Sequence, residues 1–379
     1  MNLFKDSVEY SLTTFLPELS CECVTGAAFS LARYKIKLAF FLELNNMMEE
    51  HISQLPPQLW NGFQLIAGDG TTVNMPSSPK IKKHFGIFSV SGEKTTTCLS
   101  NACMVYDVLS GFVLDSIIAP ISIGESMLII PLLKNLKTSN ALILLDRGFG
   151  YFSMIKLLII NNLEFCIRLK TSQSDFAKKA FLNPSDDFIT EWIPSEAERA
   201  TTRNQNLDTK PITVRVTKIT LKSGEVELLV SSLLDLSAIT TVQMSELYQF
   251  RWTIEEGYKD LKPKMKLEQF GCRHYKGIYQ EFYAHIFMLN LTSLLGNQAQ
   301  KQITQRTKKR KLTYQYNWQN AFKFVRNTFI KLIKLTDIQE LIDNVLVKIS
   351  KSITAIKEGR SFERIKHHKR KNRYTQCYK

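Results

Sequence analysis

The stretch Gln64-Leu-Ile-Ala-Gly-Asp69 decides the fold, together with the similar stretch Ala141-Leu-Ile-Leu-Leu-Asp146. Each is a short apolar run that ends in an aspartate, followed by Gly70 in the first case and by Arg147-Gly148 in the second. Short runs of this kind are typical of strands that are buried on both faces of a sheet. Both stretches therefore predict central strands, each with an aspartate at its carboxyl end.

The segments around these two strands predict the rest of a mixed sheet. Residues 95–108 and 111–121 are β-like and are joined by a short turn, so they predict a hairpin. Residues 126–136 and 151–161 have the apolar spacing of helices. The order strand, hairpin, helix, strand, helix indicates an α/β protein whose mixed sheet is covered by helices.

Other parts of the chain have different residue patterns. Residues 1–58 predict helices, with basic residues among the apolar ones that either contact DNA or merely flank a packed core. Within residues 166–240, the alternating runs 212–221 and 226–234 predict an antiparallel hairpin in a β-rich insertion. From residue 241 onward the pattern predicts helices to the end of the chain.

Length and composition exclude several classes of protein. The chain has 379 residues, enough for two or three domains with a full hydrophobic core. No apolar run approaches the roughly 18 residues that a membrane span requires, and the first residues lack a signal-peptide pattern. The seven cysteines include no Cys-x-x-Cys pair, which argues against a zinc ribbon and a disulfide framework. We therefore expect a soluble cytoplasmic protein.

The net charge of +15 is concentrated at one end of the chain. After residue 300 there are 21 Lys and Arg residues against 5 Asp and Glu residues. A basic end of this kind suits a polyanion, because each neutralised phosphate releases condensed counterions. The alternative is a solvated tail that only keeps the protein soluble. Neutralising the basic residues of 364–373 separates the two. If the tail binds DNA, this change weakens binding and reduces its salt dependence; if the tail only keeps the protein soluble, neither changes.

Most of the candidate functional side chains lie in one stretch, Tyr248-Gln-Phe-Arg-Trp-Thr-Ile-Glu-Glu-Gly-Tyr-Lys-Asp-Leu-Lys262. On a helix its core face would comprise Leu247, Phe250, Ile254, Tyr258 and Leu261. A second stripe would comprise Tyr248, Arg251, Glu255, Lys259 and Lys262. One interpretation is a surface helix with i,i+4 ion pairs. The other is a carboxylate that holds a metal beside cations that hold phosphates.

Two aspartates and a glutamate could share a divalent cation. Asp69 and Asp146 end buried strands, where a charged side chain is unfavourable unless it binds a cation or does chemistry. With Glu255 they supply three carboxylates, which suits Mg²⁺ and leaves room for phosphate and water. Singly, an aspartate in such a place is more often a strand-end cap or turn residue. Asp107 and Asp115 are alternatives to Asp69, whereas Glu125 is either an accessory acid or a helix N-terminal charge.

Three blocks of the sequence resemble a known family. Asp69-Gly-Thr, Asp146-Arg-Gly-Phe and Tyr248-x2-Arg251-x3-Glu255-x6-Lys262 are similar to the three catalytic blocks of DDE transposases, specifically those of the insertion-sequence-four family. The third block matches the Tyr-Arg-Glu-Lys signature of that family at every spacing. The family also places a β-rich insertion between the second and third blocks, where the hairpin is expected.

The resemblance implies a ribonuclease-H-like mixed sheet with helices on both faces, formed by residues 59–165 and 241–300. The β-rich insertion would be 166–240, the helical N-terminal DNA-binding region 1–58, and the basic helical C-terminal region 301–379. The metal ligands and catalytic residues would be Asp69, Asp146 and Glu255, with Mg²⁺ or Mn²⁺, as two ions.

The resemblance also implies the residues that contact DNA. Tyr248, Arg251 and Lys262 would contact phosphates, and the helical stripe adds Lys259. Trp192 would either stack on a flipped base or lie in the core. The basic tail contributes Arg364, Lys369 and Arg370.

The expected function is cut-and-paste DNA transposition in bacteria. The enzyme would cleave at the terminal inverted repeats and join the ends to target DNA, and a homodimer would hold both ends. Two alternatives remain at this point: a stand-alone nuclease on the same fold, and a non-catalytic DNA-binding remnant that acts as a repressor.

Overall fold

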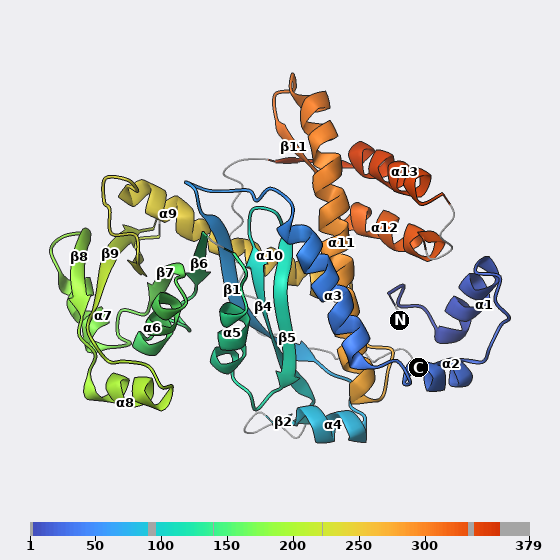
Figure 1. Cartoon of the computed structure of the whole chain (residues 1–379), viewed down its shortest axis with the longest axis horizontal. Coiled ribbons are helices and arrows are strands. Elements are labelled where there is room, and N and C mark those ends of the chain that lie inside the picture. The colour runs from blue at the N-terminus through green and yellow to red at the C-terminus, as the bar shows by residue number, and fades with distance from the viewer. Residues whose placement is uncertain (1–2, 90–95, 139, 222, 333–336, 357–379) are drawn as a thin grey trace.

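The computed structural model describes residues 3–89, 96–138, 140–221, 223–332 and 337–356. Its centre is an eight-stranded sheet with the strand order β5-β4-β1-β6-β7-β10-β9-β8 (Figure 1). The strands are β1 (Gln64–Asn74), β4 (Leu99–Asp107), β5 (Phe112–Pro120), β6 (Ala141–Leu145), β7 (Glu164–Leu169), β8 (Asp187–Trp192), β9 (Ile212–Thr220) and β10 (Val226–Ser231). The two stretches that end in Asp69 and Asp146 thus lie on neighbouring central strands.

One side of the sheet, formed by β5, β4, β1, β6 and β7, has the arrangement of a ribonuclease H sheet. β4 is antiparallel to β1 and to β5, which confirms the predicted hairpin. β6 is parallel to β1 and to β7. Two parallel crossovers beside an antiparallel hairpin give a mixed sheet that needs helices on both faces. The predicted α/β fold class is therefore confirmed.

Helices cover the two faces of the sheet. One face packs against α5 (Glu125–Lys134) and α6 (Phe152–Ile160), and the other against α9 (Thr241–Gln249), α10 (Thr253–Lys259) and α11 (Tyr275–Thr307). Because side chains alternate between the faces of a strand, β1 contributes to both cores. Its Ile66 packs with α5 and α6, whereas Leu65 and Ala67 pack with α9 to α11.

Three groups of helices surround this centre. The N-terminal group confirms the expected helices: α1 (Val8–Glu18), α2 (Gly26–Arg33) and α3 (Leu38–Ser53). α3 packs against the long helix α11, as do α12 (Trp318–Leu332) and α13 (Ile338–Lys351) (Figure 1). The remaining short helices are α4 (Pro79–Phe85), α7 (Asp175–Leu182) and α8 (Glu196–Asn204). Within the described residues, no helix is long and apolar enough to cross a membrane.

The C-terminal region is not wholly helical, contrary to the prediction. β11 (Thr313–Tyr316) and β12 (Ile353–Ile356) pair as an antiparallel ribbon, just as β2 (Phe88–Ser89) pairs with β3 (Thr96–Thr97). The run Thr313-Tyr-Gln-Tyr316 pairs with Ile353–Ile356, from Tyr316 with Ile353 to Thr313 with Ile356, so its partners lie 37 to 43 residues further along the chain. Local periodicity does not reveal a pairing over that separation.

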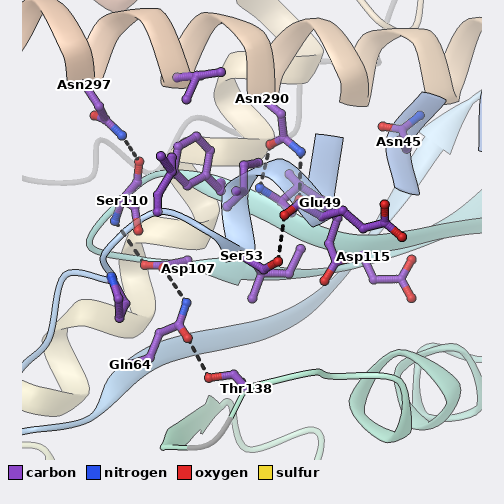
Figure 2. Close-up of a pocket in the computed structure, with 18 of the residues that line it drawn as sticks. Asn45, Glu49, Ser53, Gln64, Asp107, Ser110, Asp115, Thr138, Asn290 and Asn297 are labelled. Carbon is purple, nitrogen blue, oxygen red and sulfur yellow. Dashed lines mark hydrogen bonds between the residues drawn. The ribbon is translucent and has the colours of Figure 1, made fainter. Parts of the chain in front are cut away.

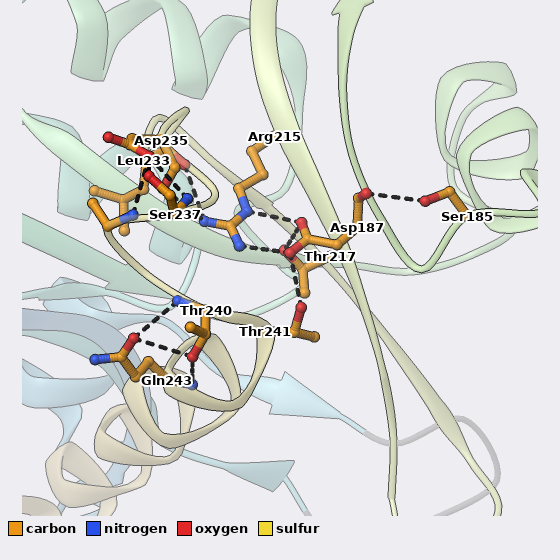
Figure 3. Close-up of polar contacts among 11 residues, drawn as sticks. Ser185, Asp187, Arg215, Thr217, Leu233, Asp235, Ser237, Thr240, Thr241 and Gln243 are labelled. Atoms are coloured by element: carbon orange, nitrogen blue, oxygen red, sulfur yellow. Dashed lines mark hydrogen bonds and ion pairs between the residues drawn. The ribbon is translucent and has the colours of Figure 1, made fainter.

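The strands between residues 166 and 240 continue the main sheet. β10 pairs with β7 on one side and with β9 on the other, which confirms the predicted hairpin. Arg215 of β9 is fully buried and binds both carboxylate oxygens of Asp187, at 2.8 Å and 2.5 Å (Figure 3). Thr241, the first residue of α9, donates to the same carboxylate at 2.9 Å. This network fixes where the chain enters α9 at the far edge of the sheet.

Candidate active site

Asp69 and Asp146 lie side by side at the middle of the sheet. Gly68 of β1 pairs with Leu145 of β6, and the next residue in each segment is one of the two aspartates. Asp146 follows the end of β6, as predicted, but β1 continues past Asp69 to Asn74, so the prediction that this strand ends at Asp69 is wrong. Neighbouring strands are only about 4.8 Å apart. By the alternation of side chains, Asp69 is on the face of Leu65 and Ala67, which is the face covered by α9 and α10.

The surroundings of Asp69 disfavour its negative charge. Burial raises the pKa of Asp69 to about 7, against the opposing effect of the backbone N–H of Gly70, which donates to its Oδ1 at 2.9 Å. The nearby carboxylates of Asp146 and Glu125 raise this pKa further, whereas Arg251 lowers it. A cation between the aspartates would relieve this repulsion.

Glu125 is an additional carboxylate at this place. It is the first residue of α5, and it lies so close to Gly70 that a Cβ on Gly70 would be 2.3 Å from its carboxyl carbon. Burial and the neighbouring Asp146 raise the pKa of Glu125, whereas Lys262 lowers it. A side chain at position 70 would require the Glu125 side chain to shift, so Glu125 packs directly against β1 beside Asp69.

The segment that carries the third block is not one continuous helix. α9 is followed by a 3-10 turn at Phe250–Trp252, then by α10, and then by a π-helical turn at Asp260–Lys264 that includes Pro263. The 3-10 turn contacts both β1 and β6. The predicted core face is confirmed, since Leu247, Ile254 and Leu261 are buried.

Two tyrosine hydroxyls hold this segment against the strands. Tyr258 donates to the carbonyl oxygen of Asp69 at 2.7 Å, and Tyr248 donates to that of Leu145, the residue before Asp146, at 3.4 Å. The two phenols thus tie one helical segment to the backbone at both aspartates. Tyr258 was expected only in the core face, because spacing gives the face of a residue but not the partner of its hydroxyl.

Glu255 reaches the site as the partner of Arg251. The Arg251 Nη2 donates to Glu255 Oε1 at 3.1 Å, which is the i,i+4 pair of the surface-helix interpretation, although Arg251 is buried. Across the described part of the chain, no three His, Cys, Asp or Glu side chains are grouped closely enough to hold a metal ion. Asp69 and Asp146 are therefore adjacent, whereas Glu255 pairs with Arg251 and does not form a metal-binding group with them among the described residues.

The two predicted lysines have different surroundings. Lys262 Nζ donates to Thr71 Oγ1 at 2.7 Å and to the Thr72 carbonyl at 2.6 Å, so it lies along β1 just beyond Asp69. Lys259 is exposed and pairs with Glu256, not with Glu255. The change from α-helix to π-helix after Lys259 explains why the two lysines do not form one stripe.

Trp192 is not placed to stack on a DNA base. Its side chain is fully buried, parallel to Phe176 at a centroid distance of 4.2 Å and edge-on to Phe152 at 6.0 Å. The core interpretation of Trp192 is therefore correct, and the DNA-binding one is wrong. The predicted contacts Arg364, Lys369 and Arg370 lie outside the described residues.

A separate polar cavity of about 1040 Å³ lies between α3, α11 and the turn that joins β4 to β5 (Figure 2). Asp107 and Asp115 line it, but Asp69 and Asp146 do not. Asp107 is buried, not solvent-facing, and accepts hydrogen bonds from Gln64 and from the turn N–H groups of Leu109 and Ser110. These bonds stabilise the turn and place Asp107 apart from the aspartate pair.

The donor set at the aspartate pair fits a magnesium ion. Mg²⁺ is commonly held by one or two carboxylates, with substrate phosphates and water completing its shell. Asp69 and Asp146 provide two carboxylates on adjacent strands, and Asp69 has the raised pKa of a carboxylate without a compensating cation. Metal and phosphate binding at this place are therefore chemically consistent with the residues present.

The residues of this site lie within a segment that matches a known protein family. Residues 60–291 match the transposase DDE domain family. Among solved structures, the chain is similar to a piggyBac transposase in a synaptic complex with hairpin DNA, at 12% identity and a TM-score of 0.42. That similarity covers 78% of this chain and 58% of the piggyBac chain, less than two thirds of its length. No curated protein matches. Since the family match spans more than half of the sequence and includes all three blocks, the chain belongs to the transposases with a DDE domain.

Proposed function

We propose that this chain is a cut-and-paste transposase of the insertion-sequence-four type. It cleaves DNA at the ends of its element and joins the freed 3′-hydroxyl to target DNA, both by metal-dependent phosphoryl transfer at one site. The observation that carries the proposal is the position of Asp69 and Asp146 on adjacent parallel strands, with the Tyr-Arg-Glu-Lys segment tied to the backbone at both. No protein nucleophile is required for this chemistry.

In this proposal, Asp69, Asp146 and Glu255 hold Mg²⁺ or Mn²⁺, as two ions. When bound, such ions stabilise the negative charge that develops on the phosphoryl group. Arg251 and Lys262 bind DNA phosphates, and Tyr248 and Tyr258 position the segment that carries them. Because Arg251 holds Glu255 in the free protein, a DNA phosphate that binds Arg251 would release Glu255 toward the aspartates.

The remaining assignments follow from this function. Duplex DNA with terminal inverted repeats and target DNA are the substrates, and a homodimer holds the two ends. We propose the domain limits given by the sequence: 1–58 and 301–379 for the DNA-binding regions, 59–165 with 241–300 for the catalytic domain, and 166–240 for the insertion.

The test is cleavage and joining of a DNA duplex that carries the terminal repeat, read from the DNA flanking the gene. Asp69→Asn, Asp146→Asn and Glu255→Gln should each abolish Mg²⁺-dependent cleavage while leaving DNA binding largely intact. The matched controls are Asp115→Asn in the polar cavity and Glu256→Gln beside the site, which should cleave normally. Cleavage without joining of pre-cut ends would indicate a nuclease, and DNA binding without cleavage by the wild type would indicate a repressor.

A further inference from the structure

Three segments distant in the sequence meet at the end of the molecule that carries α4 (Figure 1). Arg33 at the end of α2 donates to the Gly277 carbonyl of α11 at 3.0 Å. Ser78, the residue before α4, donates through its hydroxyl to the carbonyl of Arg273 at 2.7 Å. The ring of His84 stacks on that of Tyr275 with centroids 4.2 Å apart. These contacts make one continuous surface from α4 and the start of α11.

This surface, which we call the α4 patch, is basic. It consists of Lys80, Lys83, His84, Arg273, His274, Tyr275 and Lys276. Lys80, Lys83, Arg273 and Lys276 are exposed. Burial and the neighbouring cations Lys80 and Lys276 lower the pKa of His274. Within the part of the chain that the structure describes, Lys80, Lys83, Arg273 and Lys276 form no ion pair with an acid, so the described patch is positively charged.

The buried Glu281 does not offset this charge. Glu281 of α11 is fully buried and pairs with Arg33 at 3.1 Å and with Lys5 at 4.0 Å. Its charge is thus neutralised beneath the surface by cations from the N-terminal region. Surface lysines and arginines that lack acidic partners are the groups that bind phosphates in protein–DNA complexes.

The α4 patch lies along the same edge as the aspartate pair. Lys262 contacts Thr71 and Thr72, Glu268 accepts from the Asn74 N–H at 3.1 Å, and the Arg273 carbonyl accepts from Ser78. Residues 262–273 therefore run beside residues 71–78, from the aspartates to the patch. From Asp69 to the end of β1 is about 17 Å at roughly 3.3 Å per residue, about half of the ~34 Å turn of B-DNA.

We propose that the α4 patch binds the phosphate backbone of duplex DNA within about one helical turn of the cleavage site. The inference rests on the proposed function, since it takes the aspartate pair as the point of cleavage. Lysine and arginine side chains supply the charge, while the histidine and tyrosine side chains add donors that reach phosphate oxygens. Contacts of this kind fix the position of the duplex without reading its sequence.

The experiment measures binding of a 30-bp duplex of arbitrary sequence over a salt series, by fluorescence anisotropy. The test variant is Lys80→Gln/Arg273→Gln/Lys276→Gln. The control is Lys134→Gln/Lys179→Gln/Arg203→Gln, which removes the same charge from exposed positions on α5, α7 and α8. We expect weaker binding by the test variant, with a salt slope reduced by about 0.9 for each phosphate that is no longer neutralised, and little change in the control.

An unchanged affinity and slope in a test variant that melts like the wild type would overturn the proposal, and so would a change only in self-association. If the triple variant does not fold, Lys80→Gln and Lys276→Gln are measured singly, and each should reduce the slope. Asp146→Asn separates the two proposals: it should lose cleavage yet keep the wild-type slope. If Asp146→Asn cleaves normally, the proposed function fails while the slope still decides the role of the patch.

Discussion

The Arg215 network and the Asp69–Asp146 pair both place charge against the same eight-stranded sheet, but only the first balances it. Around Asp187 burial acts to raise the pKa, yet hydrogen bonds from Arg215, Thr241 and Thr217 hold the pKa of this carboxylate below its ordinary value. Around Asp69 burial prevails, and the neighbouring carboxylates add to it, so its pKa rises to about 7.

The difference separates a structural cluster from a functional one. A buried charge with matched partners fixes the positions of chain segments, here β8, β9 and the start of α9 (Figure 3). A buried charge that faces like charges is unfavourable in the free protein, and it is most simply explained by a ligand that supplies the missing opposite charge. Variants of the two clusters should therefore change different properties.

The largest effect should follow from Asp146→Asn. We expect Mg²⁺-dependent cleavage to fall by at least about 100-fold, since even partners outside the ligand sphere contribute about 10- to 100-fold. The free energy of unfolding should change little. Asp187→Asn should instead lower the free energy of unfolding and leave cleavage per folded molecule unchanged. Equal losses of cleavage in both variants would show that the distinction between the clusters is mistaken.

The next largest effect should be on the free energy of unfolding, in the variant Asp187→Ala of the Arg215 network. Asp187→Ala leaves the fully buried Arg215 without its carboxylate, and loss of one partner of a buried pair costs about 3–5 kcal/mol. Urea denaturation measures this change. Asp175→Asn, which breaks the exposed pair with Lys178, is the control and should cost less than about 1 kcal/mol. A similar small cost for Asp187→Ala would argue against the network as a structural element.

A smaller effect is expected where the tyrosines meet the strands. Tyr258→Phe keeps the ring but removes the 2.7 Å hydrogen bond to the Asp69 carbonyl. Stability should fall by about 1 kcal/mol, and cleavage by about 10-fold, because the backbone at Asp69, a proposed metal ligand, is less well positioned. Tyr248→Phe should have a weaker effect, since its bond is 3.4 Å long. Cleavage by Tyr258→Phe at the wild-type rate would remove the positioning role.

The smallest effect concerns pH. Asp69 binds its proton more tightly in the folded protein, with a pKa of about 7, than in the unfolded chain, near 3.8. Its contribution to stability is therefore complete below about pH 3.8 and is lost as the pH rises through about 7. Without metal at pH 8, Asp69→Asn should melt a few degrees above the wild type, whereas Glu256→Gln should not. A lower melting temperature for Asp69→Asn would contradict the sign of this shift.

The sequence predicted the central strands well because their composition is nearly uniform. The strand 141–145 matches β6 at both ends, since five apolar residues stop at a charged one. The hairpins and the helices of the N-terminal region also follow from local pattern. The pairing of β11 with β12 does not, because it joins segments about 40 residues apart by backbone hydrogen bonds.

The site was predicted in part for the same reason. Asp146 directly follows the end of β6, as predicted, whereas Asp69 lies within β1, which continues to Asn74 and does not end at the aspartate. Adjacency of the two strands nevertheless brings the aspartates together. The spacing of the third block predicted the core face of the segment, but not its 3-10 and π turns, which separate Lys259 from Lys262. The bond from Tyr258 to the Asp69 carbonyl depends on tertiary packing, which spacing alone does not reveal.

The most direct test of the aspartate pair is anomalous scattering from crystals of the protein soaked in Mn²⁺. Manganese is a hard cation that suits oxygen ligands, and its anomalous signal identifies it among light atoms. We predict a peak contacted by the carboxylates of both Asp69 and Asp146, and absent from crystals of Asp146→Asn. Manganese that binds at Asp107 or Asp115 in the polar cavity, and not at the aspartate pair, would contradict the account.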